Sequence, residues 1–184
     1  LHETKPLGRG EGGIAVVRSA FQRELHRACN FGFDIGKPVR LLHSFASNWR
    51  MSDIAAVFIS SHLAAYNFAD HHKVVVYYDA ALKHHGLQWA VPLNVEDPTL
   101  LSCAWIRLPE KLNAEEVVSK LQEKDIEAKH YYYPLRPLPD ALALYQETIC
   151  LPLHVDMTSE VVVRVVQELC IVCFGECTHR HRAI

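Results

Sequence analysis

The chain has 184 residues, a formal net charge of −2 and 49% apolar residue types. This composition is typical of one globular domain, or of one domain and a small second one, with a packed core. The weak net charge argues against a protein that binds nucleic acid through a basic face. We find no apolar run of the roughly 18–20 residues that a membrane helix needs, and no signal peptide. We therefore expect a cytoplasmic protein without a membrane segment, whose six cysteines are reduced.

The first third of the sequence predicts a strand, a helix and a loop. Apolar residues 14–17 predict the strand. Ser19 and Gln22 have the spacing of a capping box, which opens a helix that we expect to run to about Cys29. Residues 34–47 show no periodicity and predict a loop.

A long helix is expected in the middle of the chain. It is predicted to begin near Ser52 and to continue to about His85, where Gly86 is a good terminator. One set of residues has the spacing of three to four that is typical of a buried helix face. These residues are Ile54, Phe58, Ser61, Ala65 and Phe68.

The pattern changes after a polar connector between Pro92 and Pro98. Beyond it we expect the order β-α-β-β-α, which is a small α+β layer. Asn113 and Glu116 are placed to cap its first helix. The strands are expected at residues 102–108, 126–133 and 148–153, and the last helix at residues 158–171.

A lysine placed just before a glycine-rich turn is the sharpest chemical feature of the sequence. Lys5 ends the segment HETK, and Gly10 to Gly13 follow it. A rigid, partly desolvated lysine favours the neutral amine, and a neutral amine can form a Schiff base with an aldehyde cofactor. A surface lysine beside a glycine-rich hairpin has the same spacing, so the spacing alone leaves both interpretations open.

Five segments of the sequence form a recognisable series. They are HETKPLGRGEGG at 2–13, NFGF at 30–33, NWRMSDIAA at 48–56, IEAKHYYYP at 126–134 and CLPLHVDMT at 150–158. In this order they resemble the DegT/DnrJ/EryC1/StrS family of sugar aminotransferases. The resemblance implies an α/β protein of the fold-type-I class that depends on pyridoxal 5'-phosphate (PLP). Residues 1–91 are then the C-terminal part of the PLP-binding large domain with its linking helix, and residues 92–184 are the small α+β C-terminal domain.

The resemblance also implies roles for individual residues. Lys5 matches the lysine that forms the internal aldimine with PLP and then moves a proton. Asn48 matches the residue that reaches the cofactor phosphate of the partner subunit in a homodimer. The family's acceptors are mostly nucleotide-linked keto-sugars and a common donor is glutamate, so Arg50, Lys129 and Arg136 are candidate contacts for anionic substrates. Relatives with histidine at the lysine position act as dehydratases, so Lys5 favours transamination.

The sequence also departs from the family pattern. The family's phosphate-binding serine, its stacking aromatic residue and the aspartate that pairs with the pyridinium nitrogen match positions before Leu1. Ile54 stands where the family usually has glutamine, and Arg136 stands where it has histidine. A second interpretation is therefore a truncated, non-catalytic remnant or a dimerisation fragment of such an enzyme.

A C-terminal cluster of cysteine and histidine gives a third, weaker interpretation as a metal-binding module. It comprises Cys170, Cys173, Cys177, His179 and His181. Because the first two continue the apolar face of a helix and no second ligand pair has zinc-finger spacing, we expect a helix end and no metal.

Other titratable and aromatic residues have structural explanations. Adjacent residues on a helix point apart, so the histidine pairs at 71–72 and 84–85 are expected to be solvated. Residues 131–133, three tyrosines on a predicted strand, are expected in a core or an interface. Glu11 is expected to be a structural carboxylate of its turn.

Overall fold

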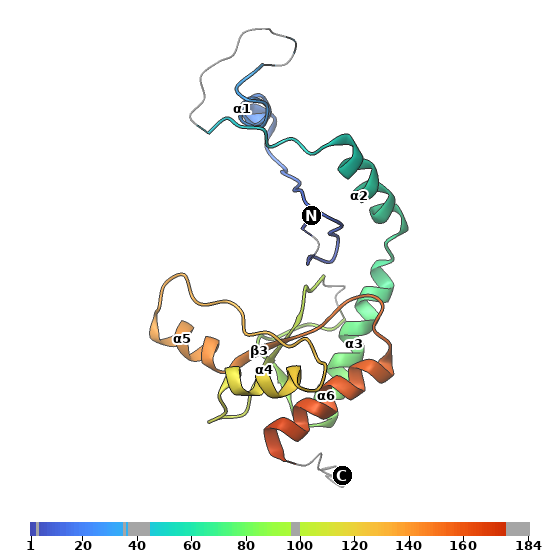
Figure 1. Cartoon of the computed structure of the whole chain (residues 1–184), viewed down its shortest axis with the longest axis vertical. Helices are drawn as coiled ribbons and strands as arrows, with labels where there is room; N and C mark the ends of the chain where they lie inside the picture. The colour runs from blue at the N-terminus through green and yellow to red at the C-terminus, as the bar shows by residue number, and fades with distance from the viewer. Residues whose placement is uncertain (3, 35, 37–44, 97–99, 176–184) are drawn as a thin grey trace. The chain divides into compact units, whose positions relative to one another are not determined.

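The computed structural model describes residues 1–2, 4–34, 36, 45–96 and 100–175. Within the chain, Leu1–Tyr66 and Asn67–Ile184 form two compact units (Figure 1). The predicted division after residue 91 concerns the domains of a complete enzyme and stays a prediction. Residues 37–44 of the predicted loop and 97–99 of the predicted connector lie outside the described residues. No helix in the described ranges is long and apolar enough to cross a membrane.

Helix α1 (Ser19–Cys29) of the first unit confirms the predicted helix and its end. The predicted capping box is wrong, because Arg18 is the N-cap residue and makes no side-chain capping bond. Ser19 is already the first helical residue, so its hydroxyl is one position too late to cap. Residues 14–17 are extended but do not form the predicted strand. A strand needs a neighbouring strand, and none of the described residues provides one there.

A buried carboxylate ties α1 to the residues that follow it. The Nε of Arg23 donates to both carboxylate oxygens of Asp34 at 3.1 Å, and a terminal nitrogen of Arg27 donates to one of them at 3.1 Å. Asp34 is only 6% exposed. The hydrogen bond from Arg23 is the largest of the effects that hold the pKa of Asp34 well below its usual range.

The Asp34 ion pairs are expected to persist under mildly acidic conditions. Because folding lowers the pKa of Asp34, their stabilising effect is complete above the unfolded carboxyl pKa of about 4 and is lost only as the pH falls through the lower folded value. Carbon NMR should therefore show an ionised Asp34 carboxylate down to about pH 3. A carboxyl that titrates near pH 4 would show that the two arginines do not hold it.

Helix α2 (Asp53–Ala65) begins where the sequence predicts. The Ser52 side chain caps it by accepting from the Ala55 amide at 3.2 Å. The long predicted helix is wrong, because Tyr66 and Asn67 are extended and α3 (Phe68–His84) is a separate helix. The Asn67 side chain accepts from the amide of Ala69, so it starts a new helix in the manner of an N-cap.

The predicted buried face of this helical region is also wrong. Ile54, Phe58 and Phe68 are exposed, and Ile59 is the buried residue of α2. The spacing correctly identifies an apolar stripe, but a stripe is buried only where another element covers it. In the described part of the first unit, no other large apolar residue is buried.

The second unit contains a sheet, helices and the hydrophobic core. Its three strands pair antiparallel in the order β1 (Gln88–Trp89), β2 (Ala104–Arg107) and β3 (Thr148–Leu151). In the register of the central pair, Ala104 faces Leu151 and Arg107 faces Thr148. Besides α3, the helices of this unit are α4 (Ala114–Gln122), α5 (Pro139–Gln146) and α6 (Ser159–Phe174). Helix α6 packs against both α3 and α4 (Figure 1).

Most elements of the second unit confirm the prediction. The strands at 102–108 and 148–153 and the last helix correspond to β2, β3 and α6. Residues 126–133 are not a strand, because they contribute only one bridge, between Lys129 and Cys150. Helix α5, which begins at Pro139, was not predicted. His71 is buried rather than solvated, because α3 is covered by the rest of the unit.

The cap of α4 offers a local test of the second unit. The Asn113 side chain accepts from the amides of Glu115 and Glu116 at 2.9 and 3.1 Å. Asn113→Ala removes both bonds and should lower the free energy of unfolding by about 1 kcal/mol. Urea denaturation followed by circular dichroism measures this loss. Ser119→Ala, at an exposed residue of the same helix, is the control and should change the stability by less than about 0.5 kcal/mol.

Candidate functional site

Lys5 lies in a tight, hydrogen-bonded turn of the first unit. Its amide donates to the His2 carbonyl at 2.9 Å, and the Gly8 amide donates to the Lys5 carbonyl at 2.8 Å. The His2 ring makes a hydrogen bond with the Thr4 hydroxyl at 2.9 Å and lies 3.3 Å from the Glu11 carboxylate. Glu11 therefore pairs with a residue of its own turn, as expected of a structural carboxylate. The backbone of Lys5 is held by hydrogen bonds to His2 and Gly8.

The turn closes only because residue 8 is glycine. A Cβ atom at Gly8 would lie 1.7 Å from the His2 carbonyl oxygen and 2.5 Å from its carbon. Both are backbone atoms of the same turn, so no side-chain movement can relieve the contact. Sequence reasoning placed the important glycines at 10–13 and missed Gly8; its spacing of three residues from the lysine was the available signal.

The Lys5 side chain is exposed, which differs from the partial desolvation that we expected. No ion pair joins its ammonium to a carboxylate of the described residues. The turn therefore presents an accessible amine on an ordered backbone. Among the residues that the structure describes, none covers this amine and removes it from water.

Asn48 is held against the end of α1 by backbone bonds on both sides. The Ser47 amide donates to Ala28 at 3.0 Å, the Trp49 amide donates to Cys29 at 3.2 Å, and Asn48 itself bridges to Asn30. The structure thus brings the NFGF and NWRM segments of the sequence side by side.

Arg50 places a positive charge beside the Asn48 side chain. The Nε of Arg50 donates to the side-chain amide oxygen (Oδ1) of Asn48 at 3.4 Å, and both side chains are exposed. The amide NH₂ of Asn48 and the outer nitrogens of Arg50 can then donate to the same anion. The two side chains thus offer hydrogen-bond donors that suit a phosphate or a carboxylate.

The lysine turn also packs against the segment that carries Asn48. A Cβ atom at Gly12 would lie 2.4 Å from the terminal carbon of Met51 and 3.7 Å from a methyl of Ile59. The Nε of Arg9 makes a hydrogen bond with the Nδ1 of His62 at 3.3 Å. Three of the five motif segments are therefore assembled within the first unit, along the start of α2.

Arg136 and Lys129 belong to the second unit, at the two ends of an aromatic segment. Arg136 is exposed, whereas Lys129 pairs with Glu127 at 2.6 Å and lies 6.0 Å from the ring of Tyr131. Because its ammonium is paired with Glu127, Lys129 is less available than Arg136 to bind an anionic substrate group. The expected core position of residues 131–133 is wrong for Tyr132 and Tyr133, because both are 64% exposed, although Tyr133 packs edge to face on Tyr145. An interface role of these residues stays a prediction.

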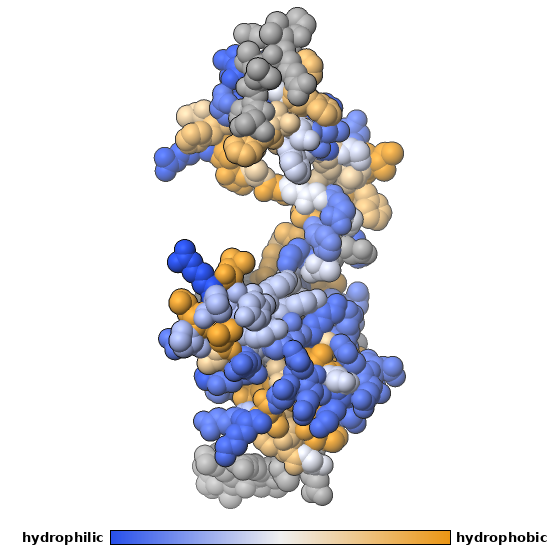
Figure 2. Space-filling view, turned by 60° about the vertical axis from the view of Figure 1, so that its left-hand side comes forward, coloured by the Kyte–Doolittle hydropathy of each residue, from blue (hydrophilic) through white to orange (hydrophobic). Residues whose placement is uncertain are grey.

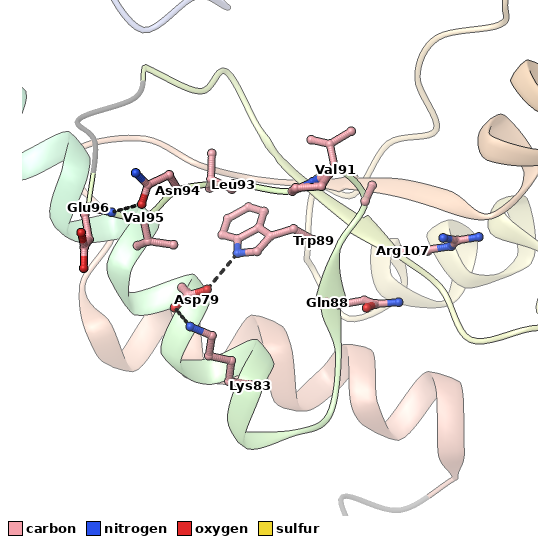
Figure 3. A pocket seen from close by; sticks show the side chains of 12 residues that line it. Asp79, Lys83, Gln88, Trp89, Val91, Leu93, Asn94, Val95, Glu96 and Arg107 are labelled. Carbon is pink, nitrogen blue, oxygen red and sulfur yellow. Dashed lines mark hydrogen bonds and ion pairs between the residues drawn. The ribbon is translucent and has the colours of Figure 1, made fainter.

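A cavity of about 570 Å³ lies beside strand β1 in the second unit (Figure 3). Several of its polar groups are already paired: Asp79 accepts from the Trp89 indole at 3.2 Å and from Lys83 at 2.7 Å, and Arg107 donates to Glu147 at 2.7 Å. None of the predicted site residues lines it. We therefore assign it no part in the chemistry.

The metal-binding interpretation has no support in the described ranges, where no three histidine, cysteine or acidic side chains are grouped to hold a metal ion. Cys170 is buried and Cys173 half-buried on α6, as the predicted apolar face requires. Cys177, His179 and His181 lie outside the described residues.

Comparisons with solved structures agree on one fold. An aminotransferase from Bacillus cereus, described as PLP-dependent, has 25% sequence identity and a TM-score of 0.75, and the match covers 91% of this chain and 49% of that one. Helicobacter pylori PseC, an aminotransferase involved in the biosynthesis of pseudoaminic acid, has 18% identity and a TM-score of 0.74, with coverages of 86% and 47%. The PMP-form of a sugar aminotransferase from Streptococcus pneumoniae has 19% identity and a TM-score of 0.72, with coverages of 87% and 45%.

These matches confirm the predicted α/β fold of fold-type-I PLP enzymes, and the chain spans about half the length of each relative. The same Streptococcus pneumoniae protein is also known in a PLP-form, in keeping with a family that uses pyridoxal phosphate. The sequence model of the DegT/DnrJ/EryC1/StrS aminotransferase family matches residues 1–170. That match covers nearly the whole chain, so the chain belongs to this family.

Proposed function

We propose that this chain is the C-terminal half of a PLP-dependent aminotransferase, with Lys5 as the residue that bonds to the cofactor. The enzyme transfers an amino group from an amino-acid donor, with glutamate as the proposed donor, to a nucleotide-linked keto-sugar. The observation that carries the proposal is the closed turn around Lys5, which fixes the lysine backbone and leaves its amine accessible. A cytoplasmic location is part of the same proposal.

The described residues fit one part of a PLP site. PLP supplies an electron sink that stabilises negative charge on the substrate carbon. Lys5 supplies a primary amine that can bond to an aldehyde, and in its released form the same amine can accept and return a proton at Nζ. The turn limits how far Nζ can move, because its backbone is bonded at both His2 and Gly8.

The pair formed by Asn48 and Arg50 is proposed to bind the anionic groups of the site. Both are exposed and are joined by one hydrogen bond, which orients their remaining donors together. In the proposed homodimer, Asn48 donates to the cofactor phosphate held by the partner subunit. Arg50 and Arg136 are proposed to contact anionic substrate groups, because a guanidinium can donate two parallel hydrogen bonds to a carboxylate or phosphate.

Borohydride trapping tests the assignment of Lys5. The chain is incubated with PLP, reduced and digested, and the modified lysines are mapped by mass spectrometry. We expect Lys5 to be labelled several-fold faster than Lys111 or Lys120, which are exposed as Lys5 is. Lys5→Ala should lose this label and retain the weak labelling elsewhere.

Equal labelling of all lysines would contradict the proposal for this chain and favour the second candidate, a non-catalytic remnant or dimerisation fragment. The observation that favours this candidate is that the chain matches about half of each relative. The two candidates differ in one respect: only the first predicts a lysine with special reactivity.

A further inference from the structure

The second unit holds two cysteines that the proposed PLP chemistry does not use, Cys103 and Cys150. The unit has a packed interior, which includes the fully buried Tyr78, Ile106 and Leu169, and its side seen in Figure 2 is largely hydrophilic. In a packed unit the side chains of a sheet keep defined positions. Groups that this sheet brings together therefore stay together.

Strands β2 and β3 bring the two cysteines to one side of the sheet. Cys103 directly precedes β2, and Cys150 lies in β3, opposite Trp105 in the register of the two strands. Ala104 and Ile106 are fully buried in the core. The alternation of a strand then points Trp105, and with it Cys150, to the other side. The Trp105 indole N–H donates to the Cys103 sulfur, so that sulfur lies on this side as well.

The two sulfurs are in contact but differ in exposure. The thiol of Cys150 makes a hydrogen bond with that of Cys103, and this bond together with burial raises the pKa of Cys150 well above its usual range. Both residues are thiols in the structure. Cys150 is 4% exposed, whereas Cys103 is half-buried. The pair therefore combines one thiol that solvent reaches with one that is enclosed.

These differences give the two thiols different chemical roles. A thiolate is the nucleophilic form of cysteine, and an N–H donor such as the Trp105 indole favours negative charge on the sulfur that accepts from it. Cys103 is thus the thiol that reacts first, and Cys150 lies beside the product. Because Cys103 precedes the paired residues of β2, the sheet does not fix its backbone, and it can adjust to the geometry that a disulfide needs.

We propose that Cys103 and Cys150 are a modification site for hydrogen peroxide, which converts the two thiols reversibly into a disulfide. First the Cys103 thiolate attacks the peroxide: an S–O bond forms, the O–O bond breaks, and the departing hydroxide takes up the proton that the thiol has lost. The sulfur is oxidised to a sulfenic acid and the peroxide is reduced to water.

In the second step the Cys150 sulfur displaces the hydroxyl group of this sulfenic acid. An S–S bond forms, the S–O bond breaks, and the hydroxyl leaves as water with the Cys150 thiol proton. Two thiols and one peroxide thus give one disulfide and two water molecules. In a cytosolic protein a disulfide is usually transient and responds to the redox conditions. The site uses neither Lys5 nor PLP, so it goes beyond the proposed function.

The test uses the full 184-residue chain, first reduced and then treated with one equivalent of hydrogen peroxide. Trypsin separates the two cysteines, because Arg107 and Lys129 lie between them in the sequence. Mass spectrometry then detects the disulfide as two joined peptides. We expect the link between Cys103 and Cys150 to form at least tenfold faster than any other, and dithiothreitol should remove it.

Three substitutions assign the steps. Cys150→Ala should leave Cys103 as a sulfenic acid that dimedone traps, whereas Cys103→Ala should give neither the adduct nor the link. Cys29→Ala is the matched control, because Cys29 is half-buried as Cys103 is, and it should form the link as the wild type does. Circular dichroism verifies that each variant is folded.

Three results would overturn the inference. One is a wild type in which Cys103 is oxidised no faster than Cys173, whose pKa burial raises to about 11. The others are a dominant link between other cysteines and a folded Cys150→Ala that gives no dimedone adduct at Cys103.

The Lys5→Ala variant separates this inference from the proposed function. It should form the link as the wild type does, because the oxidation needs no amine. A link that forms without selective borohydride trapping of Lys5 would refute the proposed function alone. Selective trapping of Lys5 without the link would refute the peroxide site alone.

Discussion

Replacement of Tyr78 by alanine is expected to lower the free energy of unfolding of the second unit by about 3–5 kcal/mol. Tyr78 lies on α3 and is fully buried. Its ring meets Trp89 edge to face at 6.3 Å, and its hydroxyl donates to the Pro152 carbonyl at 2.6 Å. The substitution leaves a cavity and also an unsatisfied carbonyl, so the two losses add.

A second substitution separates these two losses. Tyr78→Phe keeps the ring and removes only the hydroxyl, so it should cost about 1–2 kcal/mol. Burial raises the pKa of Tyr78 well above its usual range, so the hydroxyl remains a donor at every pH at which the protein is handled. Urea denaturation gives both values. Tyr132→Ala, at an exposed residue, is the control. Equal effects at both tyrosines would show that Tyr78 does not anchor the core.

The elements that the sequence predicted well are those with local signals. Helix α4 has an asparagine cap followed by an apolar face, and its residues Val117 and Leu121 are buried as expected. Helix α6 likewise begins after a capping threonine, Thr158, and continues to Phe174, three residues past the predicted end. These signals act within a few residues, so they do not depend on what else is present.

The predictions that failed depend on distant neighbours. Residues 14–17 have the composition of a strand, but a strand exists only through its pairing partner. Ile54 and Phe58 lie on a real apolar stripe, but nothing described covers it. The break at Tyr66 was hidden because apolar residues continue on both sides, and Asn67 acts as a cap only when the chain turns there.

The residues of the candidate site were also predicted only in part. Spacing alone left the role of Lys5 open, and the resemblance to a family selected Lys5 and Asn48. Neither the spacing nor the resemblance indicated that the NFGF segment would hold Asn48, since that contact joins Asn30 to a residue 18 positions later. The role of Gly8 was equally hidden, because it depends on the exact approach of the His2 carbonyl.

Gly8→Ala is therefore expected to open the turn that holds Lys5. The new methyl would lie 1.7 Å from the His2 carbonyl oxygen, a contact that only a backbone movement can relieve. Overpacking of this kind costs about 1–3 kcal/mol, which is enough to reduce the closed turn at least several-fold. The bond from the Gly8 amide to the Lys5 carbonyl should be lost with it.

Gly13→Ala is the matched control, because a Cβ atom at Gly13 meets nothing within 4 Å. Amide temperature coefficients from NMR should show the Lys5 and Gly8 amides exposed to solvent in Gly8→Ala and bonded in Gly13→Ala. This readout is independent of any cofactor. Borohydride trapping then gives the consequence: if the turn is what makes Lys5 selective, its label falls toward that of the other lysines only in Gly8→Ala. Retained selectivity with an open turn would show that the reactivity of Lys5 comes from elsewhere.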